Sequence, residues 1–138
     1  GPDAGSELRE LAARHPEIAM PGFVDNLFDY LAAYPVMVNP MLTGSGLKNK
    51  TLEAMAAGKA VVTTSLGVDA FPFQDGLHGR IADDPLSFAE IVLELLDEPA
   101  SRGVLIAGAR DLVRSRYTWE AVGSAWSELL AKLGGVQS

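Results

Sequence analysis

The sequence predicts an α/β fold in which a parallel sheet carries helices on both faces. The first observation is that strand-like and helix-like patterns alternate along the 138-residue chain. The second is a pair of apolar, mostly β-branched runs at residues 36–38 and 60–64. Runs without a polar face are typical of parallel strands that are buried on both sides. The chain length fits one compact domain, residues 1–138.

The first quarter of the chain predicts two helices and one strand. Residues 6–14 have the apolar spacing of an amphipathic helix, with Ser6 as its N-cap. Residues 18–23 predict a short strand. Asp25 then caps a helix that ends before Pro35.

The middle of the chain predicts a strand, a loop, a helix and a second strand. The run at 36–38 is the first of these strands, and a glycine-bearing loop at 43–46 follows it. A helix is expected from 47 to 57, with Gly58 at its C-cap. Residues 60–64 form the second strand.

The remainder is loop and helix. Residues 65–79 are rich in glycine and predict a loop, and 80–82 predict a short third strand. From 85 to 133 the pattern is helical, with breaks expected near Pro99 and near Thr118.

This set of elements is smaller than a complete doubly wound, Rossmann-like sheet, which has about six strands. The chain supplies three or four, and we expect the first strand–helix–strand unit to be missing. A sheet without that unit exposes an edge, which proteins avoid. We therefore expect a fragment of a longer protein that covers this edge by dimerising or by exchanging elements.

Composition excludes several classes of function. The formal net charge of -7 gives no general attraction for nucleic acid. The absence of cysteine excludes disulfides, thiolate metal sites and cysteine catalysis. The two histidines, His15 and His78, are far apart, and we expect no metal site. No apolar run approaches the ~20 residues of a membrane span, and no signal peptide is visible.

Residues 36–64 are the segment most suited to chemistry, because open α/β sheets bind ligands where strands end and loops enter helices. Gly44 and Gly46 allow the backbone to approach an anion closely. The following helix start offers free N–H groups and a partial positive charge, beside the cations of Lys48 and Lys50. Glu53 lies farther along, among apolar neighbours, where a carboxylate requires a partner such as ribose hydroxyls.

Each of these features also has an ordinary structural explanation. A Gly-x-Gly before a helix is a common tight turn. Lys48 and Lys50 fit a solvated helix face, and Glu53 fits an ordinary surface position. Spacing alone does not decide between these explanations.

Several motifs resemble one family. Residues 44–62 read G-S-G-L-K-N-K-T-L-E-A-M-A-A-G-K-A-V-V. This run resembles the donor-site motif of retaining GT-B glycosyltransferases of the glycogen-synthase-like family 4 type, the group 1 glycosyltransferases. Residues 22–25 resemble the family's loop before a helix, Gly67 its glycine after a strand, and residues 76–83 its G-x-x-G-x-x-x-x-D segment. Tyr117-x-Trp119 resembles its C-terminal helices.

The resemblance implies the C-terminal, donor-binding domain of a two-domain enzyme, with roles assigned by position. Glu53 would hold the ribose, and the backbone near Phe23 and Val24 would flank the base. Lys50 would bind the donor, and Lys48 would act on the sugar and diphosphate as the catalytic cation. The residues expected to face the diphosphate and the transferred sugar are Thr43, Gly44, Ser45, Gly46 and Leu47.

Two departures from the family pattern matter. Ser45 stands where the family often has a glutamate that contacts the sugar, so the sugar contacts must differ here. The family's phosphate-binding Arg and Lys follow a first strand that this chain lacks, and the acceptor domain is absent too. We therefore expect the chain alone to bind donor poorly and to have no turnover.

The implied activity is hexosyl transfer from a nucleotide-diphosphate sugar to an acceptor hydroxyl, in polysaccharide or cell-envelope glycan synthesis. The expected partners are the donor and a glycan or lipid-linked acceptor, with no cofactor and no metal. The resemblance implies a cytoplasmic enzyme, with peripheral association of the full-length protein at the inner membrane face as a further expectation. Two alternatives stay open: an inactive binding or assembly module, and a fragment of a GT-B sugar epimerase.

Overall fold

The computed structural model describes residues 5–44 and 49–118. Contacts divide the chain into two units, Gly1–Ala33 and Tyr34–Ser138. Each unit is described by itself below.

The first unit contains two helices, α1 (Ser6–Arg14) and α2 (Leu27–Ala32), as predicted. Both N-caps are one residue away from the expected position. Gly5 precedes α1, and the Asn26 side chain accepts a hydrogen bond from the Asp29 N–H at 3.3 Å. The strand predicted at 18–23 is wrong, since these residues have no regular structure. A strand requires a neighbour for its backbone groups, and the described part of this unit contains no second strand.

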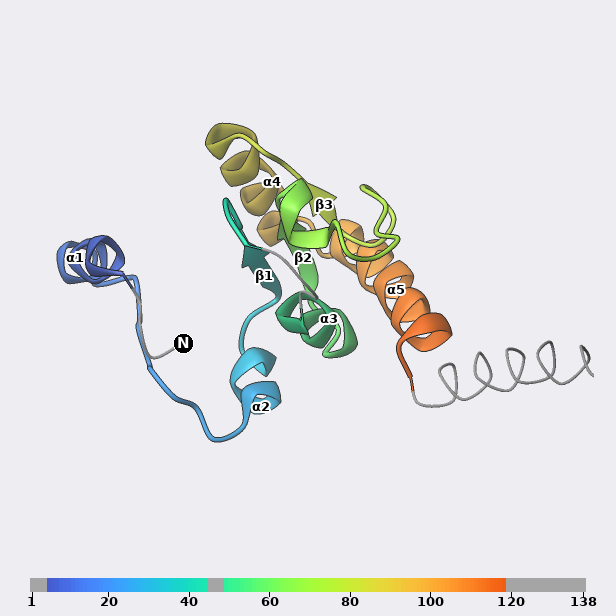
Figure 1. Ribbon diagram of the computed structural model, residues 1–138, viewed down its shortest axis with the longest axis horizontal. Helices are drawn as coiled ribbons and strands as arrows, with labels where there is room; N and C mark the ends of the chain where they lie inside the picture. The colour runs from blue at the N-terminus through green and yellow to red at the C-terminus, as the bar shows by residue number, and fades with distance from the viewer. Residues whose placement is uncertain (1–4, 45–48, 119–138) are drawn as a thin grey trace, which may run out of the picture. The chain divides into compact units, whose positions relative to one another are not determined.

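The second unit is built on a parallel sheet in the order β1–β2–β3. Its strands are β1 (Val36–Asn39), β2 (Ala60–Thr63) and β3 (Arg80–Ile81). Figure 1 shows the strands side by side with helices around them. The predicted α/β fold with a parallel sheet is confirmed.

The connections follow the predicted order. Helix α3 (Asn49–Ala56) joins β1 to β2, and Gly58 follows it with a left-handed φ of 73°. The loop after β2 begins with the 3-10 turn η1 (Ser65–Val68). The helical region divides at Glu98 into α4 (Pro85–Asp97) and α5 (Pro99–Arg116), as expected. The helix predicted to start near Thr118 lies outside the described residues.

Helices cover both faces of the sheet, because neighbouring residues of β2 point to opposite sides. Val61 packs with Met55 of α3 and with Ala109 and Leu112 of α5. The other face holds a second cluster that combines β2 with α4 and the first half of α5, formed by Ala60, Val62, Leu95 and Leu105. Helix α5 therefore contributes to both cores.

Strand β1 corrects one expectation. Its residues were predicted to be buried on both faces, yet Val38 is 47% exposed and its strand neighbours are half-buried. All four residues of β2 are buried. The difference follows from position in the sheet: β2 has a strand on each side, whereas β1 is paired with β2 alone among the described residues. An apolar run predicts a strand but not its place in the sheet.

Among the helices that the structure describes, none has both the length and the apolar character needed to cross a bilayer.

Candidate functional site

The three parallel strands end in one row. Asn39 of β1 pairs in register with Thr63 of β2, which in turn pairs with Ile81 of β3. Loops leave the sheet from this carboxyl edge, the position where open α/β sheets bind ligands. The predicted donor segment therefore starts at the edge expected for a ligand.

Helix α3 carries two of the predicted site residues on its outer side. Thr51, Ala54 and Met55 are its buried residues, whereas Lys50 and Glu53 are exposed. Residues three apart are neighbours on a helix surface, so the ammonium of Lys50 and the carboxylate of Glu53 share one solvent-facing patch. The expectation that Glu53 lies in an apolar setting is wrong, because its apolar neighbours Ala54 and Met55 turn into the core.

The loop before α3 requires glycine at one position. Gly44 has φ 125°, a conformation that L side chains rarely adopt. A Cβ there would lie 2.9 Å from Cε of Met41. Thr43 and Gly44 are both exposed. The other predicted loop residues, Ser45, Gly46, Leu47 and Lys48, lie outside the part of the chain that the structure describes.

Phe23 and Val24 belong to the first unit. Phe23 is 90% exposed, and Val24 is half-buried. Both lie in the irregular segment before α2 instead of at a strand end. The structure therefore brings Thr43, Gly44, Lys50 and Glu53 together within one unit and describes Phe23 and Val24 separately from them.

A buried polar network that the sequence did not reveal joins β1, β2 and α3. The Asn39 amide Nδ2 donates to Thr51 Oγ1 at 2.9 Å. Thr63 Oγ1 donates to the Asn39 carbonyl at 3.2 Å. Thr51 and Thr63 are fully buried. The one signal in the sequence was a polar residue on the apolar face of α3, at Thr51.

A cavity of about 300 Å³ opens at the same edge, on the side of α4. Its walls are mostly apolar, and its polar groups already have partners. Asp83 accepts from the Ser65 N–H at 2.8 Å and the Ser65 hydroxyl at 2.6 Å, and these bonds lower the pKa of Asp83. Asp84 caps α4 by accepting from the Ser87 N–H at 2.9 Å, which lowers the pKa of Asp84. The lining residues are Pro40, Leu42, Thr64, Ala82, Asp83, Asp84, Pro85, Phe88 and Ala89.

Asp84 is the N-cap of α4. Asp83 instead fixes the start of η1 through Ser65. Both carboxylates are thus structural acceptors.

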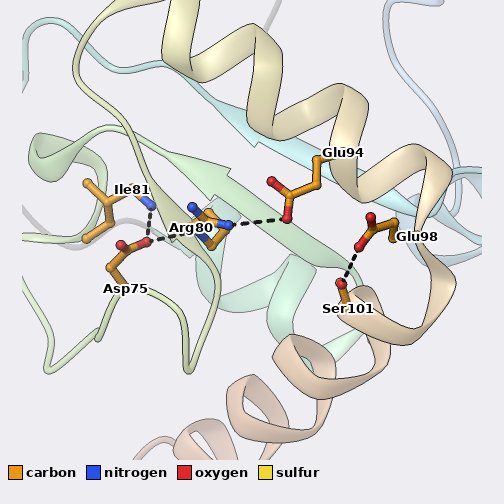
Figure 2. Close-up of polar contacts among 6 residues, drawn as sticks. All are labelled: Asp75, Arg80, Ile81, Glu94, Glu98 and Ser101. Atoms are coloured by element: carbon orange, nitrogen blue, oxygen red, sulfur yellow. Dashed lines mark hydrogen bonds and ion pairs between the residues drawn. The ribbon is translucent and has the colours of Figure 1, made fainter.

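A second polar cluster lies near the amino end of β3. Figure 2 shows Arg80 between Asp75 and Glu94, with Nε 3.4 Å from Asp75 Oδ1 and Nη1 3.6 Å from Glu94 Oε1. Asp75 also accepts from the Ile81 N–H at 2.8 Å. The two carboxylates offset the charge of Arg80. This cluster links the loop before β3 to α4 and leaves no unbalanced cation for an anionic ligand.

The histidines lie in different environments. His15 is exposed, with Nδ1 3.0 Å from Glu17. His78 is buried, and its Nδ1 accepts from the Gln74 N–H at 3.0 Å. Within residues 5–44 and 49–118, no group of three or more His, Asp or Glu side chains is arranged to hold a metal ion.

Comparison with known proteins finds related sequences. The family model described as glycosyl transferases group 1 matches residues 1–98. A protein named D-inositol 3-phosphate glycosyltransferase 1, from Catenulispora acidiphila, is 30% identical over 133 residues, which are 94% of this chain and 27% of that protein. A protein named as an uncharacterized 44.6 kDa protein in the cps region, from Klebsiella pneumoniae, is 29% identical over 90 residues.

That second match covers 65% of this chain and 23% of the Klebsiella protein. The chain thus spans about a quarter of the length of these relatives. The family match includes the sheet, the glycine loop and α3, where the candidate site residues lie. On this evidence the chain belongs to the group 1 glycosyltransferase family.

Proposed function

We propose that this chain is the donor-binding part of an enzyme that transfers a hexosyl group from a nucleotide-diphosphate sugar to an acceptor hydroxyl. The observation that carries the proposal is the outer face of α3. There Lys50 and Glu53 stand side by side, just beyond a glycine loop that leaves the carboxyl edge of a parallel sheet.

In this proposal the two side chains bind different parts of the nucleotide. The Glu53 carboxylate accepts hydrogen bonds from the vicinal ribose hydroxyls, as acidic residues do in other nucleotide-binding folds. Lys50 and the free N–H groups at the start of α3 face the diphosphate. Thr43, Gly44, Ser45, Gly46 and Leu47 line the diphosphate and sugar, and Phe23 and Val24 flank the base.

The reaction breaks the bond between the anomeric carbon and the β-phosphate oxygen, and the nucleoside diphosphate leaves with the electron pair. A new bond forms from the acceptor oxygen to the anomeric carbon, and the hydroxyl proton is released. Negative charge grows on the β-phosphate in the transition state, where fixed donors and cations stabilise it. We assign the catalytic cation to Lys48 and require no metal.

The name of one relative, a protein of a cps region, supports a role in polysaccharide chemistry. The other relative is named D-inositol 3-phosphate glycosyltransferase 1, which supports glycosyl transfer but names neither a glycan nor a lipid acceptor. We infer that the complete protein acts on a glycan or lipid-linked acceptor. Because the chain covers about a quarter of these relatives, we expect it to bind donor weakly and not to turn over alone.

A second candidate function, a module that assembles with other proteins, is favoured by a different observation. Helix α4 exposes leucines on its outer side: Leu86, Leu93 and Leu96 are 70%, 61% and 46% exposed. Exposed apolar surface of this kind is often an interface. A chain that only assembles would have no reason to distinguish ribonucleotides from deoxyribonucleotides.

The test is a calorimetric titration of the 138-residue chain with uridine, guanosine and adenosine diphosphates, each in ribose and 2′-deoxyribose form. We expect at least one ribose form to bind more tightly than its deoxy form. Glu53→Ala should weaken the ribose form about tenfold, because hydrogen bonds to a charged acceptor contribute roughly 1.5–3 kcal/mol. It should also abolish the preference for ribose.

Glu90→Ala is the matched control, since Glu90 is an exposed glutamate on helix α4. We expect it to leave both affinities unchanged. If the two variants behave alike, or if no ribonucleoside diphosphate binds, the donor-binding role is rejected in favour of the assembly module.

A further inference from the structure

Hydrogen bonds from the strand ends hold the predicted donor loop at both of its ends. At its beginning, the Thr64 hydroxyl donates to the Met41 carbonyl at 2.6 Å. At its end, Asn39 Nδ2 donates to Thr51 Oγ1, in the first turn of α3, at 2.9 Å. Asn39 closes β1, and Thr64 directly follows β2. Both anchors therefore belong to the ends of adjacent, paired strands.

The two threonines are buried, Asn39 is half-buried, and the group is closely packed. Thr51 is fully buried, and Thr64 is 5% exposed. Gly67 of η1 lies against the same group: a Cβ there would be 2.9 Å from Asn39 Nδ2 and would overlap Thr63 Oγ1. Gly67 has no left-handed φ, so the requirement for glycine here is one of space. The strand ends, η1 and α3 thus fit together around these hydrogen bonds.

We propose that Asn39, Thr51 and Thr64 are positioning residues that fix residues 41–44 and the first turn of α3, the described segments on either side of the predicted donor loop, for diphosphate binding. The proposal rests on the donor-binding function above and adds the residues that hold the site in place. Removing either hydroxyl leaves its partner, the Asn39 amide or the Met41 carbonyl, without this hydrogen bond, which destabilises the structure at that point. The two hydrogen bonds also specify one arrangement of the backbone.

Conservative variants separate this role from packing. Thr51→Val and Thr64→Val remove the hydroxyls and keep the shape of the side chains. Thr51→Ser and Thr64→Ser restore the hydroxyls and serve as rescue variants. Val62→Ala is the control for general destabilisation, because Val62 is fully buried in β2 and packs with the α4 cluster on the sheet's other face.

The first measurement is amide hydrogen exchange without ligand, which reports local opening. We expect each valine variant to speed exchange about tenfold at residues 41–44 and 49–52 relative to the rest of the sheet. The serine variants should restore the original exchange rates. Val62→Ala should speed exchange without a preference for residues 41–44 and 49–52. If the valine variants give the same pattern as Val62→Ala, the positioning role is overturned.

The second measurement compares the affinity for a nucleoside diphosphate with that for the nucleoside alone, well below the unfolding temperature. We expect the valine variants to weaken the diphosphate about fivefold or more and the nucleoside less than about twofold. A variant that only destabilises the fold leaves both affinities unchanged.

The two results separate this inference from the proposed function. If the valine variants speed exchange mainly at residues 41–44 and 49–52 but the chain binds no nucleotide, the positioning role is supported and donor binding is rejected. Nucleotide binding that the valine variants leave intact supports donor binding and rejects the positioning role.

Discussion

Gly58 shows how one residue connects two elements. It ends α3 with φ 73°, and a Cβ at this position would overlap the guanidinium of Arg110 on α5. We therefore expect Gly58→Ala to lower the free energy of unfolding by about 1 kcal/mol or more through backbone strain at this left-handed φ, since the end of the exposed Arg110 side chain can move aside. Urea unfolding followed by circular dichroism measures this change.

Gly103 provides the matched control. It lies inside α5, and a Cβ there would meet no heavy atom within 4 Å. Gly103→Ala should raise the unfolding free energy by up to about 1 kcal/mol, because alanine favours a helix. Equal destabilisation by both substitutions would contradict this explanation of Gly58.

His78 predicts a pH dependence of stability. Burial lowers the pKa of His78 below 6.5, and its unprotonated Nδ1 accepts from the Gln74 N–H. Between the lowered pKa and the unfolded value, the unfolded chain binds more protons, so stability falls as pH drops below 6.5. Melting temperatures at closely spaced pH values test this.

We expect His78→Gln to flatten the melting-temperature profile between neutral and mildly acidic pH. His15→Gln should leave the profile as steep as before, because His15 is exposed. An unchanged slope in the His78 variant would show that other groups cause the pH dependence.

Among the elements, α4 depends on its N-cap. Asp84 accepts from the Ser87 N–H and is followed by Pro85 at the helix start, an arrangement that favours helix initiation. Asp84→Ala should lower the melting temperature. Asp84→Asn should lower it much less, since an asparagine side chain also caps helices. Because the cap lowers the pKa of Asp84 below 3.8, its contribution is present above that value and is lost as pH falls through the lowered pKa.

Most of the helices and strands could be predicted from local sequence. Strands β1 and β2 and helices α3, α4 and α5 follow from β-branched runs, glycine and proline. The prediction that β1 is buried on both faces was wrong, because a local sequence pattern carries no information about neighbouring strands. The strand at 18–23 was wrong for the same reason: apolar residues favour extended backbone, but a strand also needs a hydrogen-bonding partner.

For the candidate site, local sequence predicted the beginning of the loop, with Gly44, and the helix α3 that follows it. It did not predict the hydrogen bonds of Asn39 with Thr51 and of Thr64 with Met41, which join residues 12 and 23 positions apart. Such contacts exist only once β1, β2 and α3 are packed together. The expectation of an apolar environment for Glu53 was wrong, because the helical period, and not adjacency in sequence, decides which side chains lie on the same face of a helix.

The two ends of the sheet differ in chemistry. The carboxyl edge carries the glycine loop and the exposed Lys50 and Glu53, whereas near the amino end of β3 Arg80 is balanced by Asp75 and Glu94. With a net charge of -7, the chain as a whole repels anions. We therefore propose that a diphosphate binds locally, at the carboxyl edge.

The most direct test of this claim is chemical-shift mapping of backbone amides during titration with uridine, guanosine and adenosine diphosphates. We predict that at least one of them shifts the amides of Gly44, Lys50 and Glu53 most strongly. The signals of Arg80 and Glu94 should stay in place. Shifts concentrated at Arg80 and Glu94, or no shifts with any of the three nucleotides, would contradict the account.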